Sequence, residues 1–162
     1  MKIQTAQDSD IPHILMIYNQ AKLFMRETGN SDQWVGTYPE ESLLREDIIN
    51  KNLYICIDKE DIAASFFFRI GDDPTYATIV NGDWLNDDPY GVIHRLAVAR
   101  HERGIATYCI DWALSRCGNL RIDTHEENRP MRNLLDKLGF TECGTIYLPD
   151  GAPRIAYQKT EQ

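Results

Sequence analysis

The chain has a shortage of basic residues and has no long apolar run. Its 17 lysines and arginines face 25 aspartates and glutamates, for a formal net charge of −8. Nucleic-acid binding depends on neutralising phosphates with lysine and arginine, so we expect no nucleic-acid partner, whereas an amine substrate is compatible with this charge. No apolar segment approaches the ~20 residues that span a bilayer. The first residues, M-K-I-Q-T-A-Q-D-S-D, lack an apolar signal core, so we expect no membrane segment and a cytoplasmic location.

Paired cysteines and phosphate-loop motifs are also lacking. The four cysteines show no C-x-x-C or other metal-ligand spacing, so we predict no metal site and no disulfide. Cys109 and Cys117 lie at core-facing positions of a predicted helix. The sequence contains neither G-x-x-x-x-G-K-[ST] nor a complete G-x-G-x-x-G, which argues against a generic nucleotide-binding α/β domain.

What is present predicts one α/β domain over residues 1–162, because this length suffices for one core. Apolar periodicity and turn residues give the order β-α-α-β-β-β-α-β-α-β-β, a mixed sheet with helices on its faces. The predicted strands are 2–6, 53–57, 62–70, 91–98, 120–124, 141–148 and 154–159. The predicted helices begin at Asp8 or Asp10, at 40, after Gly104 and at 130.

The centre of this arrangement is the junction between strand 91–98 and the helix that follows Gly104. The first turn of a helix carries backbone N–H groups without intrahelical partners and a partial positive charge, which together favour anions such as phosphate. A glycine lets a ligand approach the backbone closely. Arg100, His101 and Arg103 add positive charge beside it. We therefore predict an anion site at this junction.

The hexapeptide H-E-R-G-I-A at 101–106 resembles the acyl-CoA pyrophosphate loop of the GNAT (GCN5-related) N-acetyltransferases, [QR]-x-x-G-x-[GA]. Gly104 and Ala106 occupy its two small positions, whereas His101 departs from its first. Downstream, Asn128 and the pair Gly139-Phe140 match the family's asparagine and helix-ending G-F. The resemblance implies the GNAT fold with a mostly antiparallel sheet, and acetyl-CoA as co-substrate. The cofactor-binding residues that it implies are Leu96, Ala97, Val98, His101, Glu102, Arg103, Gly104, Ile105, Ala106, Thr107, Asn128 and Met131.

The resemblance also implies the reaction, which is acetyl transfer to a primary amine of a small molecule or peptide by direct attack on the thioester. A backbone N–H of Leu96 or Val98 is the expected oxyanion donor. His94 is the first candidate for the general base, and His125 is the second. Each histidine also has a purely structural interpretation, as a hydrogen-bonded strand residue and as a turn residue.

The family's acid, a tyrosine in the helix after Asn128, is replaced here by Leu135. Tyr147 and Tyr157, on the last two predicted strands, are candidates for the missing acid, and packing is the alternative role for each. We also expect Trp34, Trp84 and Tyr147 to line the acceptor site, where aromatic rings can stack on a cation, although core packing is an equal alternative for both tryptophans. The missing tyrosine motivates a second functional hypothesis, a non-catalytic module that binds acyl-CoA as a sensor. The oligomeric state stays open, with a homodimer as one option.

Overall fold

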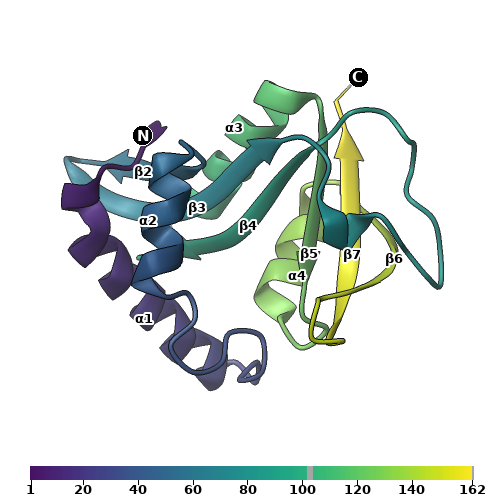
Figure 1. Ribbon diagram of the computed structural model, residues 1–162, viewed down its shortest axis with the longest axis horizontal. Coiled ribbons are helices and arrows are strands. Elements are labelled where there is room, and N and C mark those ends of the chain that lie inside the picture. Colours follow the sequence, from purple (N-terminus) through teal and green to yellow (C-terminus); the bar gives the residue numbers. More distant parts are fainter. Residues whose placement is uncertain (102–103, 162) are drawn as a thin grey trace.

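The computed structural model describes residues 1–101 and 104–161. Its centre is a seven-stranded sheet in the order β1-β2-β3-β4-β5-β7-β6 (Figure 1). Neighbouring strands are antiparallel except β4 and β5, which are parallel. The strands are β1 (Lys2–Thr5), β2 (Leu53–Asp58), β3 (Asp61–Ile70), β4 (Gly91–Val98), β5 (Asn119–Thr124), β6 (Thr141–Tyr147) and β7 (Pro153–Thr160). The predicted fold class and order of elements are confirmed.

Four α-helices cover the two faces of the sheet, and two short 3-10 turns, η1 (Asp8–Asp10) and η2 (Pro74–Tyr76), accompany them. The first pair, α1 (Ile11–Glu27) and α2 (Glu41–Ile49), packs on one face through a cluster that includes Ile14, Leu44 and Ile55. The second pair, α3 (Ile105–Cys117) and α4 (Arg129–Lys137), contributes Ile110 and Leu135 to a core on the opposite face. Side chains alternate between the faces of a strand, so β2 supplies Ile55 to one core and Cys56 to the other.

The helix ends and faces differ from the predictions in three places. Asp10 stands at the N-cap position of α1, but its side chain makes no capping hydrogen bond to the helix, because its carboxylate accepts the Gln7 backbone N–H at 2.8 Å instead. The apolar periodicity that predicts these two helices places Leu23 and Ile49 on their apolar faces, yet the two side chains are 54% and 78% exposed. Leu23 lies two residues beyond the buried Ala21 and Ile49 one beyond Ile48, so the ~100° helical turn per residue points both side chains outward.

The two halves of the sheet separate along the junction of β4 and β5. These strands pair only at Gly91 with Leu120 and at Val92 with Arg121, and then diverge (Figure 1). The edge of β4 beyond Val92 therefore has no β5 partner. Because the two strands diverge, an extended ligand has room along this part of β4.

A β-bulge lies in the same part of β4. His94 pairs with Phe67 and Ala97 with Ser65, so that Arg95 and Leu96 both lie opposite the single residue between these partners. Arg95 has a φ of 54°, and its carbonyl accepts a hydrogen bond from the Tyr18 hydroxyl at 2.8 Å. Burial raises the pKa of Tyr18 to about 12, so this hydroxyl stays protonated and can donate at neutral pH. The bulge re-aims the backbone and side chains of β4 where the strand leaves β5.

Candidate active site

Two cavities lie along the diverging part of β4. The smaller one, of about 240 Å³, lies at the start of α3. The structure brings together there all the described residues that we predicted to bind the cofactor, namely Leu96, Ala97, Val98, His101, Gly104, Ile105, Ala106, Thr107, Asn128 and Met131. The other two predicted residues, Glu102 and Arg103, lie outside the described residues.

The wall of the smaller cavity at α3 has the features of an anion site. Gly104 precedes the helix with a φ of 67°, and a Cβ built on it would meet no atom of the described residues within 4 Å. Tyr108 donates its N–H to the Gly104 carbonyl at 3.0 Å. The amides of 105–107 precede this hydrogen bond and thus belong to the helix terminus that lacks intrahelical acceptors. Nearby, the His101 ring stacks on Phe24 with centroids 3.7 Å apart.

The larger cavity, of about 530 Å³, adjoins the smaller one. Met25, Leu96, Asn128 and Met131 line both, so the two cavities share a wall near the bulge. Asn128 is fixed from two sides: its Oδ1 accepts the Met131 N–H at 3.2 Å, which caps α4, and its Nδ2 donates to Gln33 Oε1 at 2.9 Å. Asn128 thus caps α4, whereas its contact with a ligand stays a prediction.

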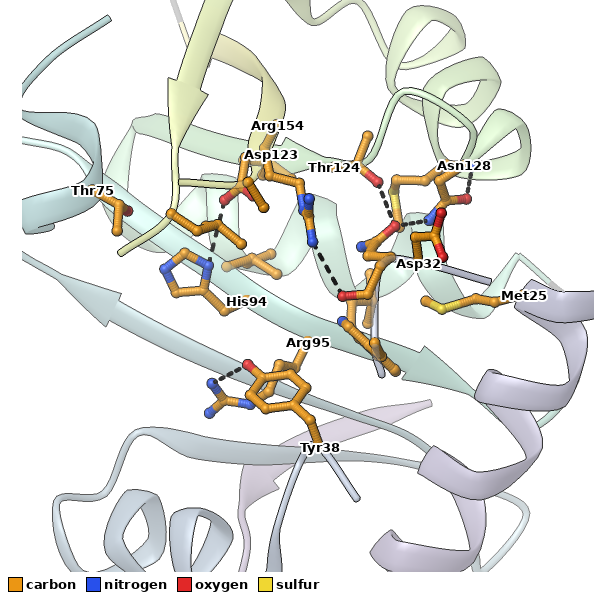
Figure 2. Close-up of a pocket in the computed structure, with 18 of the residues that line it drawn as sticks. Met25, Asp32, Tyr38, Thr75, His94, Arg95, Asp123, Thr124, Asn128 and Arg154 are labelled. Carbon is orange, nitrogen blue, oxygen red and sulfur yellow. Dashed lines mark hydrogen bonds and ion pairs between the residues drawn. The ribbon is translucent and has the colours of Figure 1, made fainter. Parts of the chain in front are cut away.

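His94 lies in the larger cavity between two carboxylates. Its Nε2 is 2.6 Å from Asp73 Oδ2. Its Nδ1 is 3.7 Å from Asp123 Oδ1 on the other side (Figure 2). Asp123 also accepts a 2.5 Å hydrogen bond from the Tyr76 hydroxyl. The consecutive residues 93–96 all line this cavity, so His94 and Leu96 border the same space.

Asp73 is held in its ionised form. Burial raises the pKa of its carboxyl, but hydrogen bonds from His94 and from the side chain and backbone of Thr75 outweigh burial and lower the pKa below its usual value. An ionised carboxylate can only accept hydrogen bonds, so the His94 Nε2 carries a hydrogen. In the neutral imidazole, Nδ1 is then the basic nitrogen, and it faces Asp123 across a gap too long for a hydrogen bond.

Several residues of the larger cavity were not predicted from the sequence. Two signals in the sequence could have identified Asp73. It belongs to the stretch G-D-D-P-T, in which Asp followed by Pro is typical of a helix start. It also lies in a long loop, and long loops in compact domains are often functional. Arg95, which is paired with Asp47, and Arg154 carry no comparable local signal. Gln33 accepts hydrogen bonds from Asn30, Thr124 and Asn128 and so fixes the loop before α2 against the far half of the sheet.

The structure separates three predicted site residues from these cavities. His125 accepts the Glu127 N–H at Nδ1, 3.0 Å away, as a turn residue, and it lines neither cavity. Tyr147 lies half exposed at the end of β6, because its neighbour Leu148, rather than Tyr147 itself, points toward the larger cavity. Trp84 packs on the Arg121 guanidinium at 4.1 Å and donates Nε1–H to the Tyr76 carbonyl. The predicted placement of these three residues at the site is therefore not observed.

The remaining predictions divide between cavity and core. Trp34 lines the larger cavity and also packs edge-on against Tyr18, with centroids 5.5 Å apart. Leu135 is fully buried in the core beneath α4.

Within residues 1–101 and 104–161, no group of three or more His, Cys, Asp or Glu is placed to hold a metal ion. None of the helices in these residues has both the length and the apolar character needed to cross a membrane.

The diverging β4–β5 pair, the start of α3 with its unpaired amides and the adjoining larger cavity are the arrangement expected of an acetyltransferase. The model of the acetyltransferase (GNAT) family matches residues 21–140, and the chain belongs to this family. A search of curated proteins found no significant match.

Solved structures agree with this assignment. A GNAT-family acetyltransferase from Streptococcus agalactiae is 32% identical, with a TM-score of 0.92 and coverage of 99% of this chain and 95% of that one. A GNAT-family acetyltransferase from Listeria monocytogenes is 19% identical, with a TM-score of 0.71 and coverage of 98% and 94%. A chain of the NatC complex bound to Gag peptide and CoA is 16% identical, with a TM-score of 0.61 and complete coverage of both chains, which shows a shared fold.

Proposed function

We propose that the protein is an N-acetyltransferase that transfers the acetyl group of acetyl-CoA to a primary amine of a small molecule or peptide. One observation carries the proposal. A cavity at the start of α3 and a cavity holding a carboxylate-oriented histidine open on either side of the same residues, Leu96 and Met131. Family membership supports the acetyl transfer, and the geometry supports a direct reaction between two ligands that meet there.

The smaller cavity is the proposed acetyl-CoA site. Its open space at Gly104 and the free amides of 105–107 fit a diphosphate. The unpaired edge of β4 at Leu96–Val98 offers backbone groups to an extended pantetheine arm, as in strand addition. In this arrangement the thioester lies near the shared wall, where the N–H of Leu96 or Val98 can stabilise the tetrahedral oxyanion.

The larger cavity is the proposed acceptor site. Its lining carries four carboxylates, Asp32, Asp73, Asp123 and Asp150, which attract an ammonium group. An amine must lose its proton before it attacks, and amines are mostly protonated near neutral pH. His94 Nδ1 can take that proton, while Asp73 holds the opposite nitrogen and fixes the ring. We therefore retain His94 as general base, and His125 and Tyr147 drop out of the mechanism.

One observation favours the second hypothesis of acyl-CoA binding without turnover. Leu135, at the position of the family's acid, is fully buried and has no proton to donate. In the catalytic proposal, the departing thiolate is protonated by water, which is feasible because thiols ionise near pH 8.5. Binding of coenzyme A together with failure to acetylate any amine would establish the second hypothesis instead.

Thiol release from acetyl-CoA with a panel of amines tests the proposal. His94→Gln retains a polar side chain but removes the base, so we expect kcat/KM to fall by about 10²- to 10⁴-fold. The Kd for acetyl-CoA should stay unchanged, because His94 lies outside the smaller cavity. His125→Gln is the matched comparison, and its rate should equal that of the unaltered protein. Equal rates for His94→Gln and the unaltered protein would remove His94 from the mechanism.

A further inference from the structure

Arg154 is a buried cation that faces the proposed acceptor cavity. It lies on β7, is 6% exposed, and its side chain points into the larger cavity between His94 and Asn128 (Figure 2). Its Nη1 donates to the Pro153 carbonyl at 2.8 Å, and its Nη2 donates to the Gln33 carbonyl at 3.2 Å. These acceptors are uncharged.

Charge compensation distinguishes Arg154 from the other basic groups of this cavity. Arg95 is paired with Asp47, and His94 is paired with Asp73. Across residues 1–101 and 104–161, Arg154 makes no ion pair with any carboxylate. A guanidinium taken out of water without an opposite charge is unfavourable, and such a group is retained where something else supplies the charge.

The chemistry of the guanidinium indicates which group would supply the compensating negative charge. Arginine has five N–H donors in a planar fork that matches the two oxygens of a carboxylate. Two carbonyls leave several of these donors unused. The same cavity has Asp73 and Asp123 beside His94, where we place the amine. One cavity thus presents a place for a cation and a separate place for an anion.

From this arrangement we infer that the acceptor carries a carboxylate as well as a primary amine, and that Arg154 binds that carboxylate. The inference rests on the proposed function, because it assumes that the amine reacts at His94. The volume of about 530 Å³ is of the size that small-molecule sites have, so a free amino carboxylic acid is the expected source. An acidic side chain at the start of a peptide offers the same chemistry.

Matched pairs of acceptors test the inference without any mutation. Each amino acid is compared with its carboxamide, which keeps the amine and side chain but loses the anion. In a second arm, peptides beginning with Asp or Glu are compared with those beginning with Asn or Gln. We measure kcat/KM for acetyl transfer, and binding by calorimetry to the protein saturated with coenzyme A. We expect kcat/KM and the association constant of the favoured acid to exceed those of its amide by about 10- to 100-fold. This factor corresponds to the free energy of a charge-assisted hydrogen bond. The arm that shows this ratio identifies whether a free amino acid or the acidic first residue of a peptide supplies the carboxylate.

Variants of Arg154 then test whether this residue binds the carboxylate. Arg154→Met should reduce the acid-to-amide ratio to near one, and Arg154→Lys, which keeps a point charge, should retain part of it. A merely structural role, holding the loop at Gln33, would weaken acid and amide equally and leave the ratio unchanged. Arg45→Met, which removes an exposed arginine on α2, is the control and should keep the full ratio. If Arg154→Met does not fold, the acid-to-amide ratios of the unaltered protein and of Arg154→Lys decide whether Arg154 binds the carboxylate.

The outcomes separate this inference from the proposed function. Acids that bind tightly but are not acetylated would leave Arg154 as a carboxylate site and disprove the enzyme. Amines that are acetylated with equal efficiency as acid and amide would leave the enzyme and disprove the carboxylate site. Failure to bind any acid in preference to its amide also overturns the inference.

Discussion

Placing a negative charge at Gly104 is the most direct test of the anion site. A Cβ at this position meets no atom of residues 1–101 and 105–161 within 4 Å, so a short side chain does not push on the core. The backbone there is left-handed, with a φ of 67°, which asparagine and aspartate tolerate better than other side chains. Gly104→Asp and Gly104→Asn are therefore a nearly isosteric pair that differs in charge.

The expected difference in affinity for coenzyme A between the two variants follows from their difference in charge. For an aspartate about 5 Å from one phosphate charge, with an effective dielectric of about 20, repulsion is about 3 kcal/mol. At about 1.4 kcal/mol per factor of ten, the Kd of Gly104→Asp for coenzyme A should exceed that of Gly104→Asn by roughly 100-fold or more. Stability should not fall in parallel, because aspartate and asparagine are both good residues at a helix N-cap.

Calorimetry with coenzyme A and with acetyl-pantetheine completes the test. Acetyl-pantetheine lacks the diphosphate, so its affinity should be the same for the two variants. Thermal unfolding of both proteins serves as the control for folding. Equal affinities of the two variants for coenzyme A would refute a diphosphate position at the start of α3.

The other predictions concern Leu135 and Asp73. Because Leu135 is fully buried, Leu135→Ala should lower the free energy of unfolding by about 2–5 kcal/mol, measured by urea denaturation. Leu135→Tyr should cost about 1–3 kcal/mol through overpacking and give no gain in kcat; a faster enzyme of undiminished stability would contradict the placement of this side chain. Asp73 has a lowered pKa in the folded protein against about 3.9 when unfolded, so its stabilising effect is complete above pH 3.9 and is lost as the pH falls toward the folded pKa. The difference in Tm between the unaltered protein and Asp73→Asn should therefore be largest near pH 5 and shrink below pH 4, and a constant difference down to pH 2.5 would show that the carboxylate is not the stabilising form.

Local features of the sequence determined the order of the elements and one half of the site. The alternation of Gly91–Val98 gave a strand with those bounds, and the helix following it begins directly after Gly104. Asn128 caps α4 through the Met131 N–H, as its position before Pro130 predicts. These predictions succeed because caps, turns and periodicity depend on residues only a few positions apart. The smaller cavity follows from them, since most of its lining comes from one strand, one loop and one helix start.

Only the tertiary structure decided the other half of the site. Asp73 reaches His94 across 21 positions, and Arg154 reaches the Gln33 carbonyl across 121, so neither contact has a spacing that a local pattern could reveal. The bulge at Arg95 depends on the register between β3 and β4, and it lies among four consecutive residues that line the larger cavity. Trp84 and Tyr147 have suitable chemistry, but packing placed them elsewhere. The sequence by itself thus determined the strand, loop and helix start that form most of the smaller cavity, whereas the pairing of distant strands decided which charges face the larger cavity, because charge compensation is a property of neighbours in space.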